Sequence, residues 1–297
     1  METGPDPRAE DIDLDGPFRF RSWDGPSDLT FLMLHGLGGS SLSWNLVAPE
    51  LSPLGRVLAL DLVGFGETPR AGRGTGTMDQ RRTLSRFLES RGTGRVVLVG
   101  NSWGGLIAVI QAAVEPSSVA GLVLTCSVFP PVARVFPHPA VHGAFSVYDL
   151  PRVGEWFVGA RYRRLDTEKL VRAGFRFNAA DARSIPEEVI AAVVEQERSR
   201  RTDPEAATAF LDAARSLIRL LRRPDVGRRA FDGVTCPVLV VHGRRDRLVP
   251  SAWAEAELAR HPTWRGRIFP DLGHVPQLEA PGRWLSAVVD WIDEARR

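Results

Sequence analysis

The sequence has few residues that could cross-link the chain or hold a metal ion. It contains two cysteines, Cys126 and Cys236, each in or beside an apolar run that is typical of a strand. We expect both to be buried, reduced thiols, because no secretory context favours a disulfide. No C-x-x-C pair and no cluster of His, Cys and carboxylates has the spacing of a structural site, so we predict no metal.

Long apolar runs, targeting signals and a strong net charge are also missing. No run is long enough to span a bilayer, and residues 1–16 are acidic and contain proline, unlike a signal peptide. The formal net charge is only +2, which argues against a general attraction to nucleic acid or to an anionic membrane. We therefore expect a cytoplasmic protein with a small-molecule substrate. Whether it forms a homo-oligomer stays open.

Two glycine-rich stretches lack the residues that would complete a nucleotide-binding motif. Gly36-Leu37-Gly38-Gly39 does not match G-x-G-x-x-G, and Gly64-Phe65-Gly66 is not followed by the Lys-Ser/Thr of a Walker loop. We therefore predict no cofactor.

The order of apolar runs predicts one α/β domain with an insertion. Short apolar strands alternate with helices through most of the 297 residues, which favours a mainly parallel sheet with helices on both faces. We expect a loose N-terminal segment at 1–17 and an α/β core at 18–128 and 233–297. Residues 129–232 break the alternation with proline-rich turns and helical stretches, and we predict a helical cap.

Charge is unevenly divided between these parts. Residues 129–232 contain 18 basic and 14 acidic residues, so they carry +4 while the rest of the chain carries −2. We interpret the arginines of the insertion as solvated helix faces, with attraction of an anionic substrate as the alternative.

The pentapeptide Gly100-Asn101-Ser102-Trp103-Gly104 lies between a β-branched run, 95–99, and an Ala-rich apolar run, 106–114. This context predicts a strand, a sharp turn and a helix, with the serine on a strained backbone at the turn. The two glycines remove collisions on either side, and the helix directs its first N–H groups at the same point. We predict that Ser102 is a nucleophile.

A serine hydroxyl needs a neighbouring base, and histidine is the usual one because its unperturbed pKa is about 6.5. Of the six histidines, His274 follows the last predicted strand, 267–269. Its loop therefore lies at the sheet edge where Ser102 is expected. We select His274 as the base.

A carboxylate is needed to orient the base, and Asp246 lies in the loop after the apolar strand 237–241. Two alternatives compete with this assignment. Asp246 can instead form a surface salt bridge with Arg244 or Arg245. Asp271 is nearer to His274 in the sequence, but it lies on the same short loop, where the geometry towards Nδ1 is poorer.

An oxyanion hole needs two backbone donors aimed at the carbonyl oxygen that becomes charged. Trp103 offers one at the start of the predicted helix. We assign the second to Leu37, in the glycine-rich loop that follows an earlier strand. The same loop is consistent with a tight turn capped by Ser40 or Ser41, and both interpretations can hold together.

These segments together resemble the α/β-hydrolase superfamily in its capped form, from about residue 18 to 295. The resemblance implies nucleophile Ser102, acid Asp246 and base His274, in the order that the superfamily uses. It also implies oxyanion donors from Leu37 and Trp103. The matching segments are His35-Gly36-Leu37-Gly38-Gly39, Asp61-Leu62-Val63-Gly64-Phe65-Gly66-Glu67-Thr68, Gly100-Asn101-Ser102-Trp103-Gly104-Gly105, His242-Gly243-Arg244-Arg245-Asp246 and Gly273-His274-Val275-Pro276.

Departures from individual branches of the superfamily narrow the reaction. Epoxide hydrolases and haloalkane dehalogenases use an aspartate where this chain has Ser102, which disfavours those reactions. Hydrolases that cleave C–C bonds of ring-cleavage products share Gly100-Asn101-Ser102. They usually place a tryptophan after the base, where this chain has Val275.

The sequence favours a serine hydrolase that cleaves a carboxylic ester or lactone with an apolar acyl group, through an acyl-enzyme. Three alternatives stay open: a C–C bond hydrolase, a biosynthetic acyltransferase or cyclase, and a ligand receptor without turnover. Aromatic residues more often simply pack than line a pocket. With that reservation, the residues expected at the substrate are Gly36, Trp44, Phe129, Phe136, Trp156 and Phe157.

Overall fold

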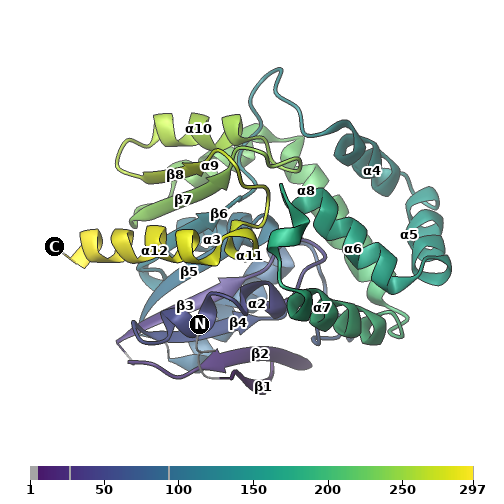
Figure 1. The fold of residues 1–297 in the computed structure, drawn as a ribbon, viewed down its shortest axis with the longest axis horizontal. Helices are drawn as coiled ribbons and strands as arrows, with labels where there is room; N and C mark the ends of the chain where they lie inside the picture. Colours follow the sequence, from purple (N-terminus) through teal and green to yellow (C-terminus); the bar gives the residue numbers. More distant parts are fainter. Residues whose placement is uncertain (1–5, 27, 93, 297) are drawn as a thin grey trace.

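A sheet of eight strands forms the centre of the protein (Figure 1). The computed structural model describes residues 6–26, 28–92 and 94–296. The strands are β1 (Arg8–Asp13), β2 (Pro17–Trp23), β3 (Leu29–Leu34), β4 (Arg56–Leu60), β5 (Arg95–Asn101), β6 (Gly121–Thr125), β7 (Val238–Gly243) and β8 (Arg265–Phe269). Their order is β1-β2-β4-β3-β5-β6-β7-β8. Pairs β1–β2 and β2–β4 are antiparallel and the others parallel, which confirms the predicted α/β fold.

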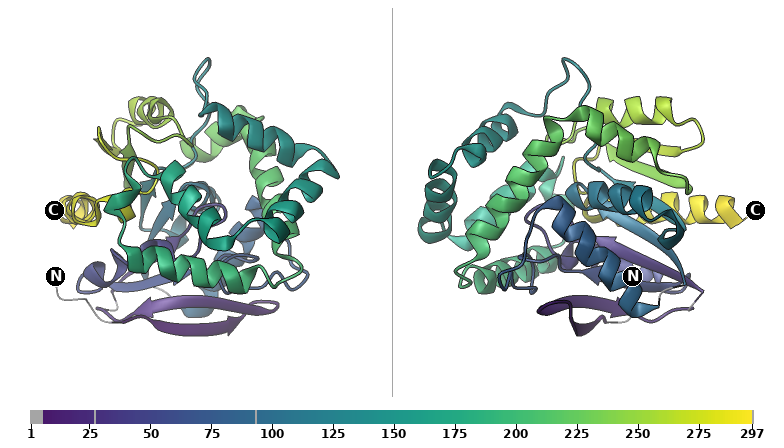
Figure 2. Two further views of the ribbon diagram at one scale, coloured as in Figure 1. Left: turned by 45° about the vertical axis from the view of Figure 1, so that its right-hand side comes forward. Right: turned by 180° about the vertical axis from the view of Figure 1, so that it is seen from behind.

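The central strands are buried on both faces because their side chains alternate between two apolar cores. In β3, Leu32 and Leu34 face the first core, whereas Phe31 and Met33 face the second. Helices α3 and α12 lie on opposite faces of the sheet (Figure 2). The first core is completed by α2 (Thr77–Arg91), α3 (Trp103–Val114) and α10 (Ser251–Arg260), and the second by α1 (Ala48–Leu51) and α12 (Pro281–Arg296).

Strand β1 lies within the segment 1–17 that we expected to be loose, so that expectation was wrong for residues 8–13. The strand is at the edge of the sheet and pairs only with β2. An edge strand exposes most of its side chains and needs no apolar alternation. It is held by backbone pairing and by ion pairs such as Arg91–Glu10, with N···O at 3.0 Å. Residues 1–5 lie outside the described part of the chain.

Residues 129–232, called the insertion from here on, connect β6 to β7 and gather on one side of the sheet (Figure 1). Its helices are α4 (Pro139–Asp149), α5 (Val153–Arg164), α6 (Thr167–Asn178), α7 (Glu187–Arg200), α8 (Ala206–Leu221) and α9 (Pro224–Asp232). Helices α4, α5 and α8 share an apolar cluster around Tyr148 and Leu211. Helix α9 buries Phe231 in the first core, to which α8 also contributes Ala213 and Leu217.

The short helix α11 (Pro276–Glu279) precedes α12 and follows the loop that contains His274. Its Leu278 and the neighbouring Val275 pack against α7 and the segment before it. No helix in the described ranges is long and apolar enough to cross a membrane.

Candidate active site

Ser102 occupies the sharp turn between β5 and α3. Its backbone has φ 54° and ψ −117°, a conformation that costs about 1–3 kcal/mol for a residue with a side chain. The flanking glycines are required by close packing. A Cβ on Gly100 would lie 2.4 Å from Gly105 Cα, and one on Gly104 would lie 2.3 Å from the Leu34 carbonyl oxygen. At this turn β5, α3 and β3 therefore pack closely around the serine.

Asp246 and His274 meet in a buried hydrogen bond. His274 Nδ1 lies 2.7 Å from Asp246 Oδ2, and both side chains are almost completely buried. They come from the loops after β7 and β8, whose ends are neighbours in the sheet. The carboxylate is also held by its other oxygen, which accepts hydrogen bonds from the N–H groups of Leu248 and Val249.

The environment of Asp246 keeps the carboxylate ionised. Burial acts to raise its pKa, but the charge and hydrogen bond of His274 outweigh burial and hold the pKa below its usual value. His242 contributes in the same direction, with Nε2 at 3.5 Å from Asp246 Oδ2. An acid that is ionised at neutral pH can fix the orientation of His274 and stabilise its cation.

Asn101, the residue before Ser102, joins the turn to the base. Its Nδ2 donates to the carbonyl oxygens of Thr125 and His274, at 3.1 and 3.2 Å. The N–H of Ser102 also donates to Thr125, at 3.0 Å. The structure therefore brings together the three sequence segments that carry Ser102, Asp246 and His274.

The glycine-rich loop after β3 lies against the serine. A Cβ on Gly36 would be 3.2 Å from Ser102 Cβ, so only glycine leaves this approach free. Within the described residues, the N–H groups of Leu37 and Trp103 donate to no acceptor of the protein. Trp103 begins α3, where N–H groups have no partner within the helix. Both groups are thus available as donors near the serine.

His35 fixes the conformation of this loop. Its Nε2 accepts the N–H of Leu62 at 3.0 Å, so the proton must be on Nδ1, which donates to the Gly36 carbonyl at 2.7 Å. Burial lowers the pKa of His35 to about 4. The ring therefore stays neutral in one tautomer and holds Gly36 beside Ser102.

Asp271, the alternative acid, and Arg244, the alternative partner of Asp246, both make other contacts. Asp271 is exposed and forms a two-pronged ion pair with Arg283, at 2.7 and 3.0 Å. Arg244 pairs with Glu255 at 2.7 Å rather than with Asp246.

Of the aromatic residues expected at the substrate, one is buried in the second core and three are exposed. Trp44 is completely buried in the second core against Trp284, which corrects the expectation that it lines a pocket. Phe136 and Trp156 are 72% and 63% exposed, and Phe157 is 38% exposed. Sequence cannot tell a pocket face from a solvent face of a short helix whose apolar residues are scattered, as in α5.

Phe129 is buried, and it packs against Phe231 and His242. It lines an apolar cavity between α3 and α9, and Ser102 and His274 are not among the residues around that cavity. Through His242, which lies 3.5 Å from Asp246, Phe129 packs behind the acid.

Phe210 on α8 is a residue that the sequence analysis missed. A Cβ on Gly38 would lie 3.4 Å from the Phe210 ring, and Leu37 packs in the same apolar cluster. The signal for it was the strong amphipathic pattern of residues 206–221, which indicates a helix with one face directed at the core.

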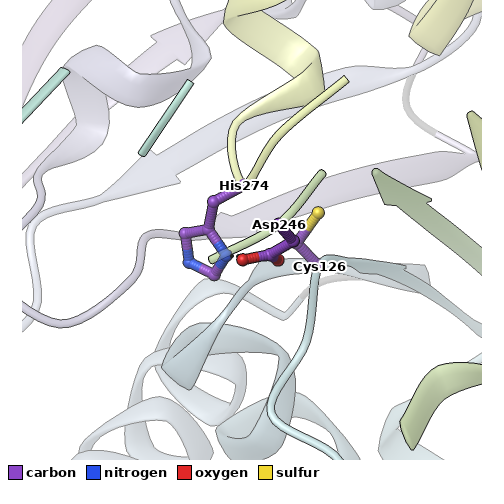
Figure 3. A group of neighbouring side chains, drawn as sticks. All are labelled: Cys126, Asp246 and His274. Atoms are coloured by element: carbon purple, nitrogen blue, oxygen red, sulfur yellow. Dashed lines mark hydrogen bonds and ion pairs between the residues drawn. The ribbon is translucent and has the colours of Figure 1, made fainter. Parts of the chain in front are cut away.

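Cys126 was expected only as a buried thiol, but it lies beside the acid. Its Sγ, an oxygen of Asp246 and a nitrogen of His274 are all within 4.8 Å of one another (Figure 3). The thiol donates to the Gly273 carbonyl at 3.4 Å. Burial raises the pKa of Cys126 well above its usual value, and the charge of Asp246 adds to this. A protonated thiol is a poor metal ligand, so we assign it a packing role at the acid.

Comparison with known proteins places the chain in a family. The family model described as alpha/beta hydrolase family matches residues 31–288. The chain belongs to this family.

The alpha/beta hydrolase relatives have different activities. One is a 2-hydroxy-6-oxononadienedioate/2-hydroxy-6-oxononatrienedioate hydrolase of Cupriavidus pinatubonensis, 30% identical over 94% of this chain and 92% of its own length. Another is a pimeloyl-acyl-carrier-protein methyl ester esterase of Edwardsiella ictaluri, 26% identical over 91% of this chain and 94% of its own. Hydrolysis is the activity that their names share.

Solved structures agree on the fold. The structure of a haloalkane dehalogenase from Bradyrhizobium elkani aligns with a TM-score of 0.78 and 24% identity. The alignment covers 98% of this chain and 100% of that chain. At this identity the likeness concerns the fold alone.

Proposed function

We propose that the protein is a serine hydrolase that cleaves a carboxylic ester or lactone through an acyl-enzyme intermediate. The observation that carries the proposal is the buried 2.7 Å hydrogen bond between Asp246 and His274, with Ser102 on a strained turn whose Asn101 contacts the same loop. A nucleophile, a base and an orienting acid are the three groups that acyl transfer requires.

The hydrogen bond to Asp246 determines which nitrogen of His274 is basic. Nδ1 carries the proton that is donated to the carboxylate, so Nε2 is left to remove the proton of Ser102. Ser102 Oγ attacks the carbonyl carbon, and His274 then gives its proton to the leaving alcohol. Water, deprotonated by the same nitrogen, cleaves the acyl-enzyme and regenerates Ser102.

Charge on the tetrahedral intermediate would be bound by the N–H groups of Leu37 and Trp103. Their freedom from protein acceptors, together with the approach of Gly36 to Ser102, supports this assignment. The glycine also leaves room for the substrate carbonyl. Such donors act in a site that water barely reaches, since Ser102 is only 8% exposed.

A second candidate is hydrolysis of a C–C bond in an acidic substrate. The name of the Cupriavidus relative describes a dicarboxylate substrate. In this chain, Arg200 on α7 is nine-tenths buried, and its Nη1 has no hydrogen-bond partner among the described residues. The guanidinium lies 6.0 Å from the Phe65 ring, which packs against His35 and Trp103. Val275 in place of the tryptophan usual after the base argues against this candidate.

Labelling with a fluorophosphonate tests the proposed nucleophile. We expect stoichiometric modification at Ser102, no labelling of Ser102→Ala and slow labelling of His274→Ala. A folded wild-type protein that takes up no label would overturn the proposal.

A substrate panel separates the two reactions. It contains p-nitrophenyl esters of increasing chain length, lactones and a dienedioic oxo acid, each assayed with wild type and Arg200→Gln. Turnover of esters or lactones at equal rates in both proteins supports the first candidate. Turnover of the oxo acid alone, with a raised KM in Arg200→Gln, supports the second. A small-molecule substrate and a cytoplasmic location complete the proposal.

A further inference from the structure

The main chain of His274 is held from two sides. Its carbonyl accepts from Asn101 Nδ2 at 3.2 Å, as described above. Its N–H donates to the carbonyl of Asn178, at 2.8 Å. Asn178 is the last residue of α6, so the insertion itself provides one of the two bonds that fix the backbone of the base.

Glu279, a buried residue of the core, also contacts both the loop of His274 and the insertion. Its carboxylate accepts from Gly273 at 3.0 Å and from Val275 at 3.3 Å, the two residues on either side of His274. It also accepts from Ala180 of the insertion at 2.8 Å. Burial raises the pKa of Glu279, and these N–H bonds act in the opposite direction. One buried side chain thus joins the base loop to the insertion.

The fit between the two segments leaves no space for a side chain. A Cβ on Gly273 would lie 2.5 Å from the Asn178 carbonyl oxygen and 2.6 Å from the Ala180 nitrogen. Arg247, next to the acid, shares the two N–H groups of its Nη1 among the carbonyls of Arg176, Phe177 and Ala179, at 3.0, 3.1 and 3.4 Å. The end of α6 is therefore attached to the acid loop and to the base loop together.

We propose that Glu279 is a positioning residue of the catalytic base, and that it acts by tying the His274 loop to residues 178–180 of the insertion. This inference rests on the proposed function, in which His274 is the base. Docking of the insertion and placement of the base are then one event, because the same carboxylate makes both sets of bonds. A base loop that loses this tie keeps Asp246 within reach but holds the imidazole in several orientations.

Two variants test the two halves of the tie. Glu279→Gln keeps the size of the side chain but turns an N–H donor towards at least one backbone N–H. Ala180→Pro removes the N–H of the insertion that donates to Glu279, and it places a ring carbon at this close contact. Ala179 has φ −82° and ψ 151°, which is the extended conformation that a following proline requires. Glu257→Gln is the matched control, because Glu257 is equally buried but lies on α10, outside the site.

Hydrogen exchange of the backbone gives a readout that does not depend on the reaction. We expect the amides of Gly273, His274 and Val275 to exchange about tenfold faster in Glu279→Gln. In Ala180→Pro the His274 amide should exchange faster, since its acceptor Asn178 is released. Unchanged exchange at these amides in both variants would overturn the inference, whatever the outcome of labelling.

Kinetics distinguish positioning from a general loss of structure. For the ester that the wild type turns over best, we expect kcat to fall at least about tenfold in Glu279→Gln with KM nearly unchanged, and the rate of fluorophosphonate labelling to fall in parallel. Glu257→Gln should retain both. An equal fall in the control, or a change confined to KM, would contradict a positioning role. If the wild type itself takes up no label, the proposed function fails, and the exchange data still decide whether Glu279 holds the loop.

Discussion

The insertion meets the core along two edges that use different chemistry. At the first, called the base edge, main-chain groups of residues 176–180 bind Arg247, His274 and Glu279. At the second, called the oxyanion edge, α8 packs on the loops 36–38 and 64–77. Here a Cβ on Gly64 would lie 2.7 Å from Ala209 Cβ, and Thr75 Oγ1 donates to the Ala209 carbonyl at 2.9 Å.

The two edges differ in the free-energy cost of separating the insertion from the core. Separation at the base edge would break the hydrogen bonds from Ala180 to Glu279, from His274 to Asn178 and from Arg247 to the end of α6. A polar group that stays buried without its partner costs about 1–3 kcal/mol. Separation at the oxyanion edge would expose apolar surface such as Phe210, which costs about 25 cal/mol per Å². It would also release the Thr75 hydroxyl, which can then hydrogen-bond to water. We expect substitutions at the base edge to affect the rate, and substitutions of α8 side chains at the oxyanion edge to affect mainly substrate binding.

The largest effect is expected for Asp246→Asn, at the acid that hydrogen-bonds to His274 of the base edge. The amide would donate to His274 Nδ1 and stabilise the wrong tautomer. We expect kcat to fall by about 10⁴-fold with little change in KM. Steady-state kinetics on the best ester of the panel measures this. A loss below tenfold would show that Asp246 is not the orienting acid.

A smaller effect is expected for the pH dependence of the stability, which depends on His35 beside the oxyanion edge. The pKa of His35, at the oxyanion edge, is lowered from 6.5 to about 4 by burial, with the charge of Arg200 acting in the same direction. The unfolded chain therefore binds a proton between these values while the folded protein does not. The stabilisation is complete above pH 6.5 and is lost as the pH falls towards 4, by about 3 kcal/mol.

Urea unfolding at pH 7, 6, 5 and 4.5 measures the contribution of His35. In His35→Gln the midpoint should change less over this range than in the wild type. His242, whose pKa is also lowered by burial, contributes in the same direction to both proteins. Asp246 adds its own loss only below its unfolded value of 3.8, because its folded pKa is lowered. Equal slopes in the two proteins would contradict the assignment to His35.

Phe210→Ala tests the oxyanion edge without touching the base edge. The ring packs over Gly38 and in the same apolar cluster as Leu37, the residue proposed to bind the substrate oxygen, and its removal takes apolar surface from that region. We expect KM to rise about tenfold for long acyl chains and kcat to change little. A series of esters from acetate to decanoate measures the dependence on chain length. A fall in kcat with constant KM would mean that α8 acts on the chemistry instead.

The smallest effect is expected for Asp271→Asn. This carboxylate is exposed and pairs with Arg283, so its loss should change the free energy of unfolding by no more than about 0.5 kcal/mol. Its kinetic constants should equal those of the wild type. A large loss of activity would reopen the choice between Asp271 and Asp246.

The fold and the positions of the chemical groups could be predicted because they depend on local patterns. The strand before Ser102 and the helix after it show in the residue types, and parallel strands place their carboxyl ends at one edge. Asp246 and His274 could then be chosen from their places after β7 and β8.

The contacts of the insertion could not be predicted, because they depend on which helix faces meet. Trp44 and Trp156 are equally aromatic in the sequence, yet one is completely buried and the other is 63% exposed. The role of Glu279 in joining the base loop to the insertion could not be predicted, because its partners are backbone N–H groups, which nearly every residue type has. Strand β1 was missed for a similar reason: it is held by backbone pairing and ion pairs, without an apolar pattern.

Because Ser102 has a positive φ, stability and activity favour different residues at this one position. Every side chain at this turn bears the strain, and glycine alone would release it. An inactive Ser102→Ala protein therefore keeps the strain of the wild type, whereas Ser102→Gly gives up the chemistry and the strain together. The residue that the reaction needs most is thus one whose replacement by glycine would stabilise the backbone, at the cost of the nucleophile.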